Sequence, residues 1–148
     1  MASGPRVLEL ALVLLAASSL AGCGKFREIS TCRALVRETN PTLDQIEQLS
    51  KKQSADQQAR ADQQARMAKL YTELAKRLKP HATGPSTLAA AIKDYAGVLE
   101  ATGTALKNHS DATRSGTFGR SNEARRELDR LVKRERASLT RIEGECHG

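Results

Sequence analysis

The feature that most constrains the fold is a stripe of mostly apolar side chains in the second half of the chain. Its members are separated by alternating steps of four and three residues, and they are Leu88, Ile92, Tyr95, Leu99, Thr102 and Leu106. Such steps place side chains on one face of an α-helix, whereas a half-buried strand alternates every second residue. The pattern therefore predicts an amphipathic helix from residue 86 or 87 to about residue 107.

Three further stretches carry the same periodicity. The first spans about 31–49, where Pro41 predicts a kink or a short break because proline lacks a backbone N–H. The second spans about 55–78. The last begins at residue 121, where Ser121 is the predicted N-cap, and ends near residue 144.

The connections between these helices are marked by residues that disfavour helix. Residues 79–86 hold two prolines and a glycine and predict a turn, and the polar residues 108–120 predict a loop. Within the second helix, residues 55–60 are repeated letter for letter as 61–66. A repeat this short is not a solenoid unit, and replication slippage is the simplest explanation for it.

Four helices with short connections predict one bundle over residues 31–148. Short connections favour antiparallel neighbours, so the expected fold is all-α, an up-down-up-down four-helix bundle. Aromatic residues make up 3% of the chain and there is no Trp, which argues against a sandwich or a barrel. The alternative is three packed helices with the first attached loosely.

The first 22 residues have the pattern of a signal peptide. Arg6 precedes an apolar stretch over residues 10–20, which is shorter than the about 20 residues needed to cross a bilayer. The stretch ends in Leu20-Ala21-Gly22-Cys23, which resembles the lipobox of bacterial lipoproteins. The alternatives are an ordinary secretory signal and a buried internal helix.

The resemblance to bacterial lipoproteins implies a location and a modification. It implies cleavage after Gly22, a thioether from Cys23 to diacylglycerol and an acyl chain such as palmitate on the new amino group. Two or three acyl chains hold a protein stably on a membrane. Residues 23–30 would form the lipidated tether. Gly24 stands where an aspartate would retain the protein on the inner membrane, which implies an outer-membrane address with the bundle in the periplasm or at the cell surface.

The two remaining cysteines are predicted to form a disulfide. In an even-numbered antiparallel bundle, Cys32 near the start and Cys146 near the end lie at the same end, and an exported compartment permits the bond. The alternative is a ligand or metal carrier in which the thiolates join His81 and His147. The close Cys–Cys spacing of zinc motifs is missing, so we expect neither a metal nor a cofactor.

The remaining patterns favour an interaction protein over an enzyme. No nucleophile elbow, phosphate loop or metalloprotease motif occurs, and the carboxylates fall mainly at predicted surface positions. The net charge is +7, but acids are interleaved with the bases and aromatic residues are few, which argues against nucleic acid binding.

The end of the bundle far from the tether is the predicted partner-binding surface. It should gather more bases than acids, which suits an acidic envelope protein or polymer, although a merely solvated end is the competing interpretation. The candidate residues are Lys51, Lys52, Lys107, Arg114 and Arg120.

Overall fold

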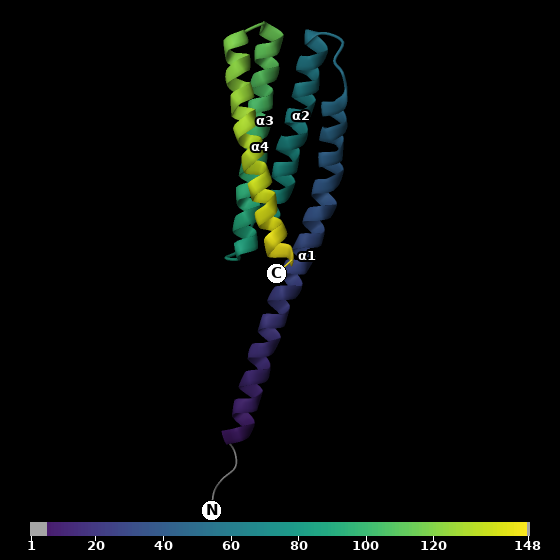
Figure 1. The fold of residues 1–148 in the computed structure, drawn as a ribbon. Coiled ribbons are helices and arrows are strands. Elements are labelled where there is room, and N and C mark those ends of the chain that lie inside the picture. The colour runs from purple at the N-terminus through teal and green to yellow at the C-terminus, as the bar shows by residue number, and fades with distance from the viewer. Residues whose placement is uncertain (1–5, 148) are drawn as a thin grey trace, which may run out of the picture.

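The described part of the chain folds into four long helices. A computed structural model describes the backbone of residues 6–147 and the side chains of residues 24–147. The helices run alternately up and down along one axis (Figure 1), which confirms the predicted antiparallel four-helix bundle. The elements are α1 (Arg6–Lys51), α2 (Gln57–Leu78), the short 3₁₀ helix η1 (Lys79–His81), α3 (Thr87–Ser115) and α4 (Phe118–His147).

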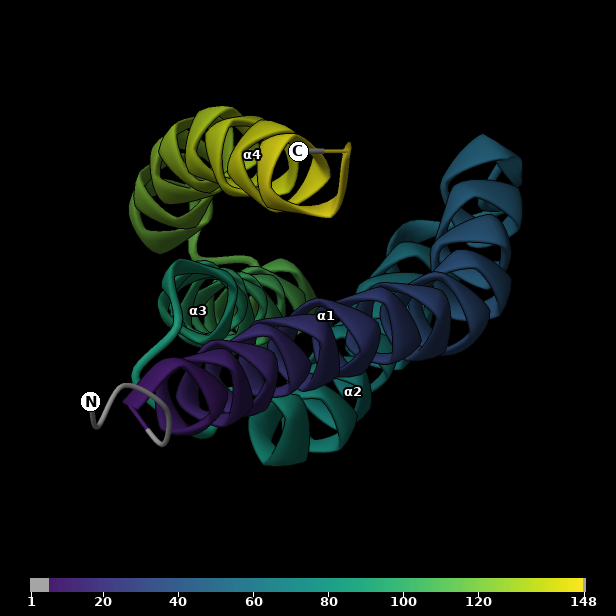
Figure 2. The ribbon, with the colours of Figure 1, turned by 90° about the horizontal axis from the view of Figure 1, so that it is seen from below.

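The four helices contribute unequally to the packing. The α2–α3 interface is the most extensive, α4 packs along α3, and α1 packs along α2. Viewed along the axis, α1 and α4 lie apart over much of their length and approach only near the end that holds the C-terminus (Figure 2). The interface between α1 and α4 is therefore the smallest of the four interfaces between neighbouring helices.

The core is built on the stripe of α3. All six of its members are buried, as the spacing predicts. Leu74 and Leu78 of α2, Leu35 of α1 and Ile142 of α4 pack against the first four of them in one apolar cluster. Towards the far end the α2–α3 interface changes to small residues, because the buried positions of α2 there are Ala61 and Ala68.

A kink or a short break was expected at Pro41; the short break does not occur, because α1 continues through that residue. A proline inside a helix costs about 3 kcal/mol through one lost hydrogen bond and a steric clash. Packing on both sides offsets this cost: Leu35 and Ile46 are buried, and Arg77 of α2 donates a 2.5 Å hydrogen bond to Thr42 Oγ1. The tether residues 24–30 also belong to α1, and residues 24–37 of this helix are called the stalk.

The predicted loop over residues 108–120 is also wrong. Helix α3 runs on to Ser115, and only Gly116 and Thr117 separate it from α4. Gly116 has φ 68°, a left-handed conformation that glycine adopts without strain, and its N–H bonds to the carbonyls of Ala112 and Thr113. Helix α4 therefore begins at Phe118, and Ser121 lies inside it rather than capping it.

Candidate functional site

The end of the bundle next to the stalk is tied together by the predicted disulfide. Cys32 in α1 and Cys146 in α4 are bonded, with Cα atoms 5.9 Å apart. The bond joins the first and last helices where they approach each other. Thr87 Oγ1 donates a 2.5 Å hydrogen bond to Glu145 Oε2 and ties the start of α3 to the same region. The thiol of Cys23, the predicted lipidation site, lies outside the described side chains.

The histidine expected near this end has a different partner. His81 Nε2 lies 3.1 Å from Glu38 Oε1, and both side chains are about one quarter exposed. The disulfide removes both thiolates that the zinc alternative requires, so His81 cannot share a metal with Cys32 and Cys146. Within the described part of the chain, no three His, Cys, Asp or Glu side chains come together as a metal site.

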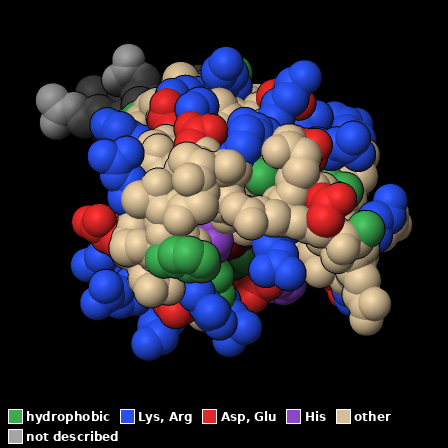
Figure 3. All heavy atoms as spheres, turned by 90° about the horizontal axis from the view of Figure 1, so that it is seen from above, with side chains coloured by type: hydrophobic (Ala, Val, Ile, Leu, Met, Phe, Trp, Pro, Cys, Tyr) green, Lys and Arg blue, Asp and Glu red, His purple; other side chains and the backbone are tan. Residues whose placement is uncertain are grey.

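The predicted partner-binding residues lie at the far end of the bundle, but most are already paired. Seen end-on, basic side chains surround this surface and acidic ones lie between them (Figure 3). Lys51 forms a 2.5 Å ion pair with Glu47, and Lys107 lies 2.8 Å from Asp111. Hydrogen bonds from these lysines lower the pKa of Glu47 and that of Asp111, so the acids stay ionised.

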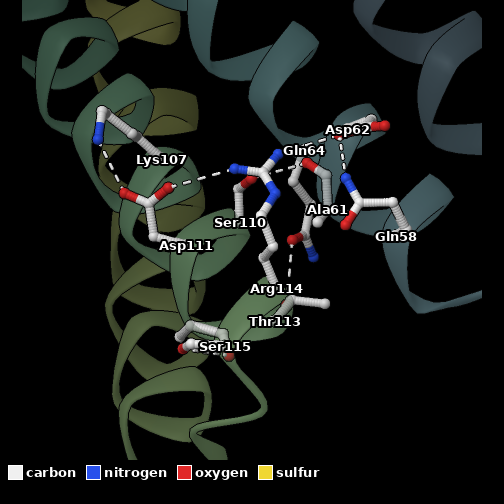
Figure 4. A network of polar contacts seen from close by, with 11 residues as sticks. Gln58, Ala61, Asp62, Gln64, Lys107, Ser110, Asp111, Thr113, Arg114 and Ser115 are labelled. Atoms are coloured by element: carbon white, nitrogen blue, oxygen red, sulfur yellow. Dashed lines mark hydrogen bonds and ion pairs between the residues drawn. The ribbon is translucent and has the colours of Figure 1, made fainter.

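A network of polar contacts joins α2 to the last turns of α3 (Figure 4). Arg114 lies 3.0 Å from Asp62 and 3.8 Å from Asp111. The buried Ser110 hydroxyl donates a 2.7 Å hydrogen bond to the carbonyl of Ala61. These contacts explain why residues 108–115 are helical: their polar side chains satisfy partners on α2 instead of water.

Arg120 lies apart from this network, beside an open groove between α3 and α4. The groove has a volume of about 970 Å³. Small side chains, among them Ala105 and Ala124, lie along it, and it carries both signs of charge through Arg120, Glu127 and Arg130. Of the predicted basic residues, Lys51, Lys107 and Arg114 are thus paired with acids, whereas Arg120 lines the groove of mixed charge.

A polar cluster inside the bundle was missed by the sequence analysis. Burial raises the pKa of Glu135 on α4. The pKa of Tyr71 on α2 is raised to about 12, mainly by burial and to a smaller extent by the negative charge of Glu135. Burial, the negative charge of Glu135 and the neighbouring Tyr71 raise the pKa of Tyr95 on α3. The buried hydroxyl of Tyr95 has no hydrogen-bond partner within the described residues. The charge of Glu135 therefore acts on both phenols, of which Tyr95 is buried, whereas Tyr71 and Glu135 itself are partly buried.

The position of Glu135 could have been found from its spacing. It lies four residues after Leu131 and four before Leu139, on the core-facing side of α4. The expectation that the carboxylates lie mainly at surface positions did not single out Glu135, although the periodicity places it in line with the apolar stripe. Carboxyl groups with shifted pKa values occur at functional sites as well as in structural contacts.

No described helix has an apolar run long enough to cross a membrane. Comparison with protein-family models, with curated proteins and with solved structures finds no match. The interpretation of function therefore depends on this chain's own residues.

Proposed function

We propose that the protein is an exported lipoprotein, anchored through acyl chains on Cys23, whose helical bundle is an interaction module of the cell envelope. The observation that carries the proposal is the motif Leu20-Ala21-Gly22-Cys23 behind a short apolar stretch. The Cys32–Cys146 bond supports it, because structural disulfides persist in exported proteins and are rare in the cytosol.

The arrangement of the first helix fits this anchoring. The thioether site lies nine residues before Cys32, and a helix rises about 1.5 Å per residue, so the disulfide lies about 14 Å along the axis from the acyl chains. The bundle would then lie close to the membrane surface. We place it at the outer membrane, with the bundle in the periplasm or at the cell surface.

Mass spectrometry of the mature protein tests the anchoring. The full chain is expressed in a Gram-negative host, and the membrane fraction is analysed intact. The expected mass is that of residues 23–148 plus diacylglycerol and one further acyl chain. Cys23→Ser should carry no lipid, whereas the matched control Cys32→Ser should keep it. A mature chain that starts at another residue, or that has the mass of its bare residues, would refute the proposal.

The far end remains the proposed contact with an acidic envelope protein or polymer. Lys52 and Arg120 are the better candidates there, since Lys107 and Arg114 already face acids. Crosslinking in intact cells should capture a partner with the native chain and lose it with Lys52→Gln and Arg120→Gln together. Lys107→Gln is the control and should retain the crosslink. Equal crosslinking by all three proteins would exclude this surface as the contact.

A further inference from the structure

The stalk carries large apolar side chains on the face that points away from the bundle. Phe26 is 77% exposed, Ile29 52% and Val36 58%. Steps of three and seven residues place them on one side of α1, and the buried Leu35 lies on the other. An exposed apolar face of this kind indicates contact with something beyond the described chain.

Basic side chains accompany the apolar ones. Residues 24–37 contain four bases and one acid, a local net charge of +3. Arg33 and Arg37 line a shallow hollow of about 260 Å³ together with Phe26 and Ile29. Among the side chains that the structure describes, none of the four bases forms an ion pair; they are Lys25, Arg27, Arg33 and Arg37.

The position of this face along the chain identifies its partner. A helix rises about 1.5 Å per residue, so Phe26 and Ile29 lie about 4.5 and 9 Å along the axis from residue 23. The stalk also projects beyond the end of the bundle, where α1 extends past the C-terminus (Figure 1). A helix that lies along a membrane surface buries its apolar face about 5–10 Å into the boundary between headgroups and acyl chains, and basic side chains on that helix favour anionic lipids.

We propose that the outward face of the stalk, with Phe26 and Ile29 as apolar anchors and Arg33 and Arg37 as basic ones, binds an anionic lipid surface. This inference rests on the proposed lipidation of Cys23, which brings the stalk to the membrane. Lipid contact gives the apolar residues a buried environment and gives the arginines headgroup phosphates as partners. It also fixes the orientation of the bundle, which the acyl chains alone leave free to rotate.

Tryptophan fluorescence tests the proposal, because the chain contains no Trp. The acylated protein, its lipid verified by mass, is reconstituted in vesicles of phosphatidylcholine with or without phosphatidylglycerol. Phe26→Trp should be quenched by lipids with brominated acyl chains, and more strongly in the anionic vesicles. The matched control is Phe118→Trp, which is 83% exposed at the far end and should stay unquenched. Both positions are exposed, so the fold tolerates either change.

The basic residues are tested in the same background. Adding Arg33→Gln and Arg37→Gln to the Phe26→Trp variant should remove its extra quenching in anionic vesicles. If acylated Phe26→Trp is quenched no more than Phe118→Trp, the lipid-binding face is refuted while the lipoprotein proposal stands. Equal quenching in neutral and anionic vesicles would refute the preference for anionic lipid. An unmodified residue 23 would refute both proposals.

Discussion

Gly103 in α3 approaches Thr72 in α2 so closely that a methyl group at position 103 would lie 2.5 Å from the Thr72 Oγ1. It would also lie 3.0 Å from the carbonyl oxygen of Ala68, which is backbone and cannot rotate away. The Thr72 hydroxyl already donates a 2.9 Å hydrogen bond to the same carbonyl. The separation of α2 and α3 is therefore set by the absence of a side chain at position 103.

Gly103→Ala should destabilise the bundle despite the higher helix propensity of alanine. Overpacking at the interface costs about 1–3 kcal/mol, more than the up to about 1 kcal/mol gained from propensity. The matched control is Gly97→Ala in the same helix, where nothing lies within 4 Å of the new methyl group. It should raise stability by about 0.5–1 kcal/mol. Urea unfolding measures both, and an equal gain at both positions would contradict the close approach.

The fold of α3 was predicted over its first two thirds and missed over its end, for one physical reason. Up to Leu106 the helix buries apolar side chains whose spacing is visible in the sequence. Beyond it, Ser110 is buried by a hydrogen bond to the backbone of α2, and Gln57 donates to the carbonyl of Thr113. Such contacts depend on which helix lies opposite, so polar residues that stabilise a helix there look like a loop in the sequence.

The pairing at the stalk end was predictable because it follows from topology alone. An even number of antiparallel helices brings the chain's beginning and end together, and the cysteines lie at those positions. The charges of the far end were not predictable in the same way. Arg114 is paired with Asp62 on another helix, which only the structure shows. Lys107 and Asp111 are four residues apart on α3, and their pairing was missed because residues 108–120 were predicted as a loop.

Removing the disulfide should destabilise the protein strongly. Cys32 and Cys146 are 114 residues apart, and closing a loop of that length contributes about 4–5 kcal/mol in the chain-entropy model. Replacing both with Ser should lower the free energy of unfolding by that order. Adding reductant to the native chain should have the same effect, and the double variant should not respond to reductant. A native chain with two titratable thiols among these positions would contradict the bond.

The two copies of the repeated hexapeptide should differ in their contribution to stability. Asp56, in the first copy, is the N-cap of α2 and accepts a 2.7 Å hydrogen bond from the Ala59 N–H. Asp62, in the second copy, makes an exposed ion pair with Arg114. Asp56→Ala should cost about 1 kcal/mol and Asp62→Ala less, since exposed ion pairs contribute about 0.2–1 kcal/mol. Thermal unfolding of both variants checks the order, and a larger loss for Asp62→Ala would contradict it.

Glu135 should make stability fall as pH rises. Burial raises its pKa in the folded chain above the ordinary value of 4.5, so the folded state favours the protonated carboxyl. The stability that the protonated Glu135 contributes is fully present at pH values below the pKa of this carboxyl in the unfolded chain. It is lost as the pH rises through the higher pKa that the carboxyl has in the folded chain. Glu135→Gln, which stays neutral, should abolish this slope, and Glu135→Leu should stabilise the chain at neutral pH by about 1 kcal/mol by adding apolar burial.

Urea unfolding midpoints are measured from about pH 4 to about pH 7. A group changes the slope of stability against pH only if its pKa differs between the folded and unfolded states, so the loss of slope in Glu135→Gln gives the contribution of Glu135. The matched control is Glu143→Gln, an exposed position on the same helix, which should leave the slope of the native chain unchanged. If Glu135→Gln keeps the native slope, the carboxyl is solvated in the folded state. That result would contradict the placement of Glu135 near Tyr71 and Tyr95, which is inferred from its effect on their pKa values.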